Sequence, residues 1–117
     1  MKKLITFDFD STLTKTRFDA SQGIFLPSMD PKEQMLDLLR VMALAFDVKI
    51  VSSRWATDKS EIIEFVKEHN LPISEIICTD GSPKWITLRQ INSIMHFDDD
   101  EIEIDSLEEK GLKGFLS

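Results

Sequence analysis

Two aspartates stand two residues apart in the stretch DFDST, directly after the apolar run LITF. Asp8 and Asp10 therefore follow a predicted buried strand, where a lone carboxylate is costly and two neighbouring ones repel each other. A solvated turn would explain the pair, and so would a positively charged group bound between the carboxylates. The other polar residues of the chain favour the positively charged group.

Three further apolar runs are also followed by residues that could do chemistry. Like the first pair, these residues stand where a predicted strand ends or where the next helix begins. They are Ser52 and Arg54 after VKIV, Lys84 after SEIICT, and Asp98, Asp99 and Asp100 after SIMHF.

Mg²⁺ is the ion that such residues suit, because it prefers carboxylates, waters and substrate phosphate as ligands. The candidate metal ligands are Asp8, Asp10, Asp98 and Asp99. Their negative charges alone would repel a phosphate, whereas one Mg²⁺ together with Lys84 and Arg54 balances them. The set predicts phosphoryl transfer, which needs positioning, charge neutralisation and an in-line nucleophile, and an aspartate can be that nucleophile.

Strands and helices alternate along the chain. Helix caps are predicted at Asp30 with Pro31 and Glu33, at Asp58 with Glu61, at Ser82 with Pro83, and at Ser106. Strands are expected at 3–7, 48–53, 74–79, 93–97 and 113–117, and helices at 30–46, 58–69, 82–91 and 106–111. This alternation predicts an α/β fold with a mostly parallel sheet covered by helices on both faces. Ligands bind beyond the carboxyl ends of the strands in such folds, which is where the candidates fall.

The composition predicts one globular domain over residues 1–117, without repeats or long linkers. The chain has 14 basic and 21 acidic residues and a formal charge of −7, so we expect neither an extended basic nucleic-acid groove nor a membrane partner. Cys78 is the only cysteine, and the opening apolar stretch is too short for a signal peptide or a membrane span. A reducing, cytoplasmic location is therefore expected.

Four motifs in this order resemble the haloacid dehalogenase superfamily of phosphotransferases. DFDST fits the DxDxT motif, KIVSSR the second motif through Ser52, Lys84 the third, and IMHFDD the acidic fourth. The resemblance covers nearly the whole chain, and the SSRW context is most similar to small members, including polynucleotide 3′-phosphatase domains and deoxyribonucleotidases. It implies a doubly wound, Rossmann-like five-stranded sheet of order 5-4-1-2-3. Many members also carry a cap domain, but the short spacings between the motifs of this chain leave little room for one, so none is expected. Residues 15–29 would form only a short flap.

The resemblance also implies roles. Asp8 would be the nucleophile and a metal ligand, and Asp10 the general acid/base, with its backbone carbonyl on the metal. Ser52 and Lys84 would hold the phosphoryl oxygens. Of the three consecutive acids, Asp99 is favoured as a direct ligand, although the register of the pair stays open by one residue. The substrate would be a phosphorylated molecule, with a nucleotide or nucleic-acid end favoured.

Several alternatives stay open at this stage. Arg54 fits a substrate contact and an ion pair within the site equally well, and Asp100 is interpreted as a surface residue. His69 and His96 are not expected to be catalytic; Cys78, Trp55 and Trp85 are expected to pack. The chain could instead be a phospho-accepting receiver with Asp80 as the acceptor, or a non-catalytic binding protein on the same fold.

Overall fold

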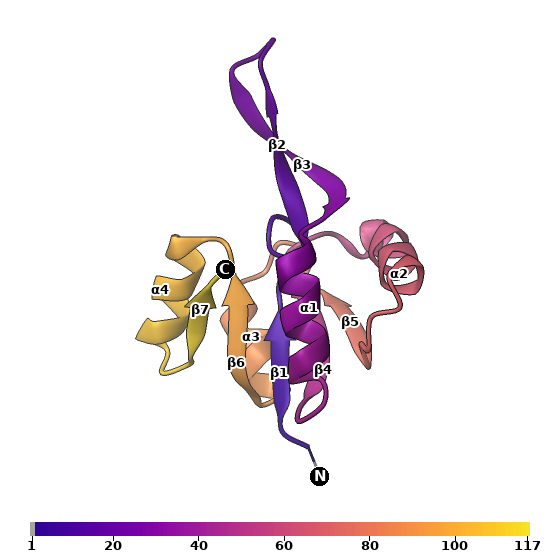
Figure 1. Cartoon of the computed structure of the whole chain (residues 1–117). Coiled ribbons are helices and arrows are strands. Elements are labelled where there is room, and N and C mark those ends of the chain that lie inside the picture. The colour runs from indigo at the N-terminus through magenta and orange to yellow at the C-terminus, as the bar shows by residue number, and fades with distance from the viewer. Residues whose placement is uncertain (1) are drawn as a thin grey trace.

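A parallel five-stranded sheet forms the centre of the molecule in the computed structural model, which describes residues 2–117 (Figure 1). Its strands are β1 (Leu4–Phe7), β4 (Asp47–Ser52), β5 (Glu75–Cys78), β6 (Ser93–Asp98) and β7 (Gly114–Leu116). They lie in the order β5-β4-β1-β6-β7, and each neighbouring pair is parallel. When these five strands are numbered 1 to 5 along the chain and read from the β7 edge, their order is 5-4-1-2-3, as predicted. The predicted fold class is therefore confirmed.

Helices cover both faces of the sheet, as the alternation predicts. They are α1 (Glu33–Met42), α2 (Lys59–Glu68), which a 3-10 turn (Ala56–Asp58) precedes, α3 (Lys84–Gln90) and α4 (Glu101–Glu109). The main core joins Leu36 and Leu39 of α1 and Ile62 and Phe65 of α2 to one face of the sheet. A smaller core on the other face consists of buried Val51, Leu88 of α3 and Leu107 of α4. The sheet is therefore doubly wound.

Residues 15–29, expected as a short flap, belong to an antiparallel hairpin of β2 (Thr14–Asp19) and β3 (Ile24–Pro31). The hairpin projects beyond the edge of the sheet where the strand arrows end (Figure 1). Phe18 and Phe25 pair across it with their rings in edge contact, 5.1 Å between centroids. Cross-strand aromatic pairs stabilise such ribbons, and here the pair lies on the surface, 54% and 70% exposed.

The first predicted helix cap is wrong, because the hairpin includes it. Asp30 and Pro31 end β3, and the Asp30 carboxylate pairs with Arg17 at 3.0 Å instead of capping a helix. Helix α1 begins at Glu33 after Lys32, which makes no side-chain cap bond. Lys32 connects the hairpin base to the loop after β1, since its amide donates to the Leu13 carbonyl at 2.8 Å.

Of the other predicted caps, the one at Asp58 has the predicted position, and those of the last two helices do not. Asp58 and Pro83 occupy the cap positions of α2 and α3, and neither makes a side-chain cap bond. The last helix begins at Glu101 rather than at Ser106, because the Asp100 carboxylate accepts a hydrogen bond from the Ile102 amide at 2.9 Å. Asp100 is thus an exposed N-cap. No helix within residues 2–117 is long and apolar enough to cross a bilayer.

Candidate active site

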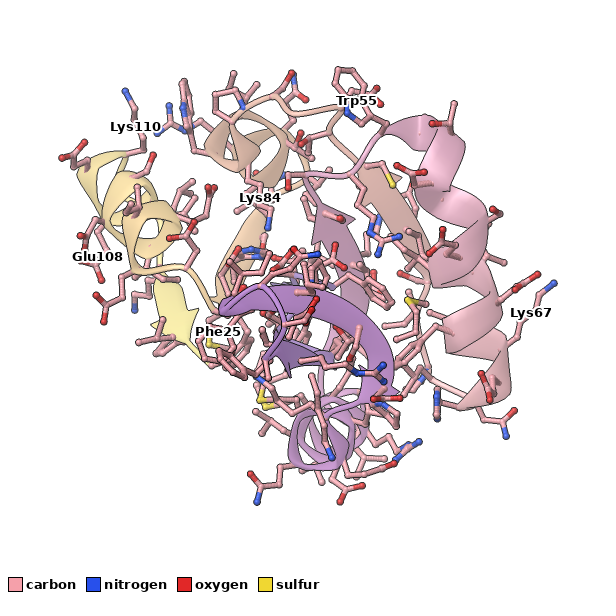
Figure 2. All side chains as sticks on the ribbon, turned by 90° about the horizontal axis from the view of Figure 1, so that it is seen from above. Phe25, Trp55, Lys67, Lys84, Glu108 and Lys110 are labelled. Carbon is pink, nitrogen blue, oxygen red and sulfur yellow. The ribbon has the colours of Figure 1, made fainter. Side chains whose placement is uncertain are left out.

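The Lys84 ammonium lies between two carboxylates that come from different strands. Its Nζ donates to Asp8 Oδ1 at 2.8 Å, just beyond β1, and to Asp98 Oδ2 at 2.7 Å, at the end of β6. All three side chains are at least nine-tenths buried. Seen from above, Lys84 reaches inward from the start of α3 toward the centre of the sheet edge (Figure 2). The structure thus brings together residues of the first, third and fourth motifs.

The two carboxylates that share Lys84 have opposite shifts in pKa. Burial raises the pKa of Asp8 to about 7, and the nearby Asp98 charge adds to this, although Lys84 acts in the other direction. Burial also disfavours the charge on Asp98, but the hydrogen bond from His96 and the charge of Lys84 hold its pKa below the usual range. The charges of both aspartates raise the pKa of Lys84 despite its burial. Asp98 is therefore the permanently charged member of the pair.

Asp99 completes a group of three acids that could hold a cation. One carboxylate oxygen from each of Asp8, Asp98 and Asp99 lies within 4.8 Å of the other two. Asp98 and Asp99 are both in this group, so its geometry leaves the register of the ligand pair open. Partial burial raises the pKa of Asp99, while the hydrogen bond with Asp8 lowers it. These donors are hard oxygens, the kind that Mg²⁺ takes.

The carboxylate of Asp10 is not part of this group and is held by Arg54. Arg54 Nε and Nη2 donate to its two oxygens, each at 2.8 Å, and Nη1 donates to Glu61 of α2 at 3.2 Å. The hydrogen bonds that Arg54 donates to Asp10 outweigh the effect of burial and raise the pKa of Arg54 further. Of the two interpretations of Arg54, the structure contains the ion pair within the site.

A tight turn after β1 presents the two aspartates of the first motif. The Asp8 amide donates to the Phe97 carbonyl at 2.8 Å, so Asp8 is still part of the sheet ladder. The Phe9 carbonyl accepts from the amides of Thr12 (3.3 Å) and Leu13 (3.0 Å), which reverses the chain. Ser11 has a φ of 62°, in the left-handed region that favours glycine, so its backbone is strained. The sequence motif thus corresponds to a turn that directs the Asp8 carboxylate into the site.

A pocket of about 610 Å³ opens over these residues. Its lining consists of Asp8, Asp10, Ser11, Ser53, Lys84, Asp98, Asp99, Asp100, Glu101, Ile102 and Glu103. Ser52 and Arg54 are not among these residues: Ser52 is buried, and its Oγ accepts from the Arg54 amide at 3.1 Å. The Ser52 hydroxyl proton stays available for another acceptor. The predicted phosphate contacts of Ser52 and Arg54 remain predictions.

The other candidates from the sequence lie away from the pocket. The Asp80 carboxylate accepts from the Ala56 amide at 2.6 Å, so the geometry gives no support to a receiver with Asp80 as acceptor. Trp55, which was expected to pack, is 62% exposed at the periphery (Figure 2). Cys78 and Trp85 pack against the two cores as expected.

Two neighbours of the site were missed by the sequence reasoning. Glu61 of α2 is the second partner of Arg54, whereas its sequence context suggested only a capping role beside Asp58. His96 Nε2 lies 3.0 Å from Asp98 Oδ2 inside the sheet. Its position two residues before Asp98 was a usable signal, because alternate residues of a strand face the same side.

Comparisons with solved structures find the same fold in phosphatases. The structure of 3-deoxy-D-manno-octulosonate 8-phosphate phosphatase from Moraxella catarrhalis, with magnesium, phosphate and KDO bound, matches with a TM-score of 0.57 and 18% identity over 92% of this chain. A Vibrio cholerae protein provisionally assigned the same activity matches with a TM-score of 0.53 and 17% identity, also over 92%. This chain spans only 63% and 62% of their lengths. No protein-family model and no curated protein matches the sequence.

Proposed function

We propose that this chain is a Mg²⁺-dependent phosphatase that hydrolyses phosphate monoesters through a phosphorylated aspartate. The observation that carries the proposal is the Lys84 ammonium between Asp8 and Asp98, at 2.8 and 2.7 Å, at the carboxyl edge of a parallel sheet. The motif resemblance assigns catalytic and ligand roles to these same residues. Solved phosphatases with this fold, one of them holding magnesium and phosphate, support the same activity.

The chemistry of the donor set fits Mg²⁺. Asp8, Asp98 and Asp99 offer three carboxylate oxygens within 4.8 Å of one another, with no sulfur or imidazole among them. These three residues would hold the ion, and Asp10 would contribute its backbone carbonyl, as the resemblance implies. When bound, the ion supplies positive charge that neutralises the phosphoryl oxygens. Lys84 supplies the other positive charge of the pocket lining.

Asp8 is the nucleophile in this proposal. One of its carboxylate oxygens forms a bond to phosphorus, while the bond from phosphorus to the departing alcohol oxygen breaks. Asp10 gives the alcohol a proton, then takes one from the water that attacks phosphorus and releases Asp8 and inorganic phosphate. Arg54 donates to both oxygens of Asp10 and so orients this side chain, and one of the two bonds must open for Asp10 to carry a proton. Lys84 offsets negative charge at the phosphoryl group throughout.

The pocket lining bears on the class of substrate. Seven of its eleven residues are acids, and Lys84 is the one base among them. A substrate with several negative charges is repelled by such a wall, whereas a single phosphomonoester on a hydroxyl-rich molecule meets many hydrogen-bond acceptors. This favours a sugar-type phosphate as a second candidate beside the nucleotide or nucleic-acid end that the sequence resemblance implies. The phosphatase of the same fold from Moraxella catarrhalis was solved with KDO and phosphate.

Hydrolysis of p-nitrophenyl phosphate tests the reaction class. We expect turnover with Mg²⁺, none in EDTA, and little with Ca²⁺, which takes more ligands at longer distances. Asp8→Ala should remove turnover, whereas Asp105→Ala, a change at an exposed acid of α4 outside the pocket lining, should keep it. Full activity in EDTA, or wild-type turnover in Asp8→Ala, would show that the proposal is wrong.

A substrate panel then separates the two candidate classes. The comparison uses kcat/KM for sugar phosphates, nucleoside monophosphates and a 3′-phosphorylated oligonucleotide at low and high salt. Because the described pocket has no basic track, any oligonucleotide activity should depend only weakly on salt. A steep loss of oligonucleotide activity with added salt would reveal a basic binding surface outside this pocket. A preference for the oligonucleotide would exclude the sugar-type candidate.

A further inference from the structure

We infer that His96 is a positioning residue that holds the Asp98 carboxylate in place for the metal, an inference that rests on the proposed function. The His96 ring is 1% exposed, and its Nε2 lies 3.0 Å from Asp98 Oδ2. Asp98 itself is 2% exposed. Neither the sequence motifs nor the resemblance assigns His96 any role.

A continuous line of buried hydrogen bonds continues behind the His96 ring. His96 Nδ1 lies 2.8 Å from Thr6 Oγ1 on the neighbouring strand β1, and Thr6 Oγ1 lies 2.8 Å from Ser93 Oγ at the start of β6. Ser93 Oγ also lies 2.9 Å from the Met95 carbonyl. The Asp98 carboxylate is therefore connected through one ring and two hydroxyl groups to the backbone of its own strand.

The donors along this line can be assigned by elimination. The Asp98 carboxylate can only accept, so His96 Nε2 must carry a proton and donate to it. In a neutral ring Nδ1 then accepts, and the Thr6 hydroxyl gives its one proton to that bond. The Ser93 hydroxyl then donates to Thr6 Oγ1 or to the Met95 carbonyl. Thr6 thus fixes the tautomer that presents an N–H group to Asp98.

The position of this line in the fold makes a purely structural role costly. Thr6 and His96 alternate with apolar residues on their strands, so they face the smaller core on the α3/α4 side. Polar side chains buried in such a core destabilise the fold unless each of them has its hydrogen-bond partners. Apolar side chains would pack there without needing any partner. Within residues 2–117 no buried side-chain N or O atom lacks a partner, so the network is complete.

His96 differs from Lys84 in being dedicated to one carboxylate. Lys84 is shared between Asp8 and Asp98, and its charge is also required by the phosphoryl group. Among the described side chains His96 forms hydrogen bonds with Asp98 and Thr6 only. It therefore keeps Asp98 Oδ2 oriented when Lys84 is engaged elsewhere. Residues that orient a metal-binding carboxylate in this way typically change metal affinity by about 10–100-fold when they are removed.

Calorimetric titration with Mg²⁺ alone tests this inference on the full chain. His96→Leu should weaken Mg²⁺ binding by about 10–100-fold. His96→Gln, which can place an N–H group near the position of Nε2, should stay within about threefold of wild type, a rescue that a packing role does not predict. Thr6→Val keeps the shape of the side chain but removes the hydroxyl that fixes the His96 tautomer, so it should weaken Mg²⁺ binding severalfold. Leu107→Ala, in the same smaller core and outside this line, is the matched control for lost packing.

The enzyme assay adds a second readout. The Mg²⁺ concentration for half-maximal turnover should rise in His96→Leu in step with the weaker binding, and kcat at saturating Mg²⁺ should largely recover. Unchanged Mg²⁺ affinity in His96→Leu or Thr6→Val, or an equal loss in Leu107→Ala, would overturn the inference. If His96→Leu fails to fold, Thr6→Val and His96→Gln still decide. Failure of wild type to bind Mg²⁺ or to turn over would instead refute the proposed function itself.

Discussion

Asp8→Asn should make the metal-free protein more stable while it removes turnover. In the folded protein the pKa of Asp8 rises from 3.8 to about 7, mainly because the carboxyl is buried. A raised pKa means that the folded state binds a proton which the unfolded state has already lost. The stability of wild type therefore falls as the pH rises between these two values.

The size of this effect follows from the same two values. Each pH unit is worth about 1.4 kcal/mol, so an ionised Asp8 costs the fold about 4 kcal/mol above pH 7. Asparagine keeps an oxygen that accepts from Lys84, and Lys84 keeps Asp98 at 2.7 Å. After allowance for imperfect amide hydrogen bonds, we expect a gain of at least about 2 kcal/mol at pH 8. A chain of this length gains about 4 °C in Tm per kcal/mol, so Tm should rise by about 8 °C.

Thermal and urea unfolding in EDTA at pH 5 and pH 8 measure this gain. The advantage of Asp8→Asn should be smaller at pH 5, where wild type is largely protonated at Asp8, and it should shrink at pH 8 when Mg²⁺ stabilises wild type alone. Asp105→Asn, an exposed acid on α4, is the control and should change stability by less than about 0.5 kcal/mol. An Asp8→Asn protein that is less stable than wild type at pH 8 in EDTA would refute the reasoning.

Three further outcomes are expected. Mg²⁺ binding should release about half a proton from wild type at pH 7 and almost none at pH 9, because the pKa of Asp8 is about 7. Calorimetry in buffers of different ionisation heat measures this release, and equal release at both pH values would contradict the prediction. Arg54→Lys cannot form the two bonds of 2.8 Å to Asp10, so kcat should fall about tenfold with alkyl phosphates and less with p-nitrophenyl phosphate. Equal losses of kcat with the two substrates would argue against a proton-transfer role of Asp10. Asp100→Ala should cost about 1 kcal/mol in urea unfolding, because it removes the α4 cap, and Asp100→Asn should retain most of that stability; no loss in Asp100→Ala would show that the cap is unimportant.

The sheet could be predicted from the sequence because its strands are short apolar runs bounded by polar residues. Such runs predict buried strands, and Ile5, Phe7, Val48 and Ile50 are indeed buried. The hairpin could not be predicted, since the residues on β2 and β3 are mostly exposed and carry no regular alternation of buried and exposed positions. The first helix cap was misplaced for the same reason, because strand pairing of Pro31 with Thr14 competes with helix initiation.

The candidate site was predictable only in part. Asp8, Lys84 and Asp98 follow strand ends, and parallel strands bring such ends together, so their convergence needed no knowledge of side-chain contacts. The bond between Arg54 and Asp10 depends on rotamers and on distances across the sheet edge, which spacing along the chain does not fix. From its place inside a strand His96 is not expected to be catalytic, although it shares a strand face with Asp98.

Detection of the phosphorylated aspartate tests the central claim most directly. Wild type is acid-quenched during turnover of p-nitrophenyl phosphate with Mg²⁺, digested, and analysed by mass spectrometry. We predict a phosphoryl group on the peptide containing Asp8, more of it in Asp10→Asn, where release from the enzyme is slowed, and none in EDTA or in Asp8→Asn. Turnover by Asp8→Asn, or a phosphoryl group on another residue during turnover, would contradict the assignment of Asp8 as the nucleophile.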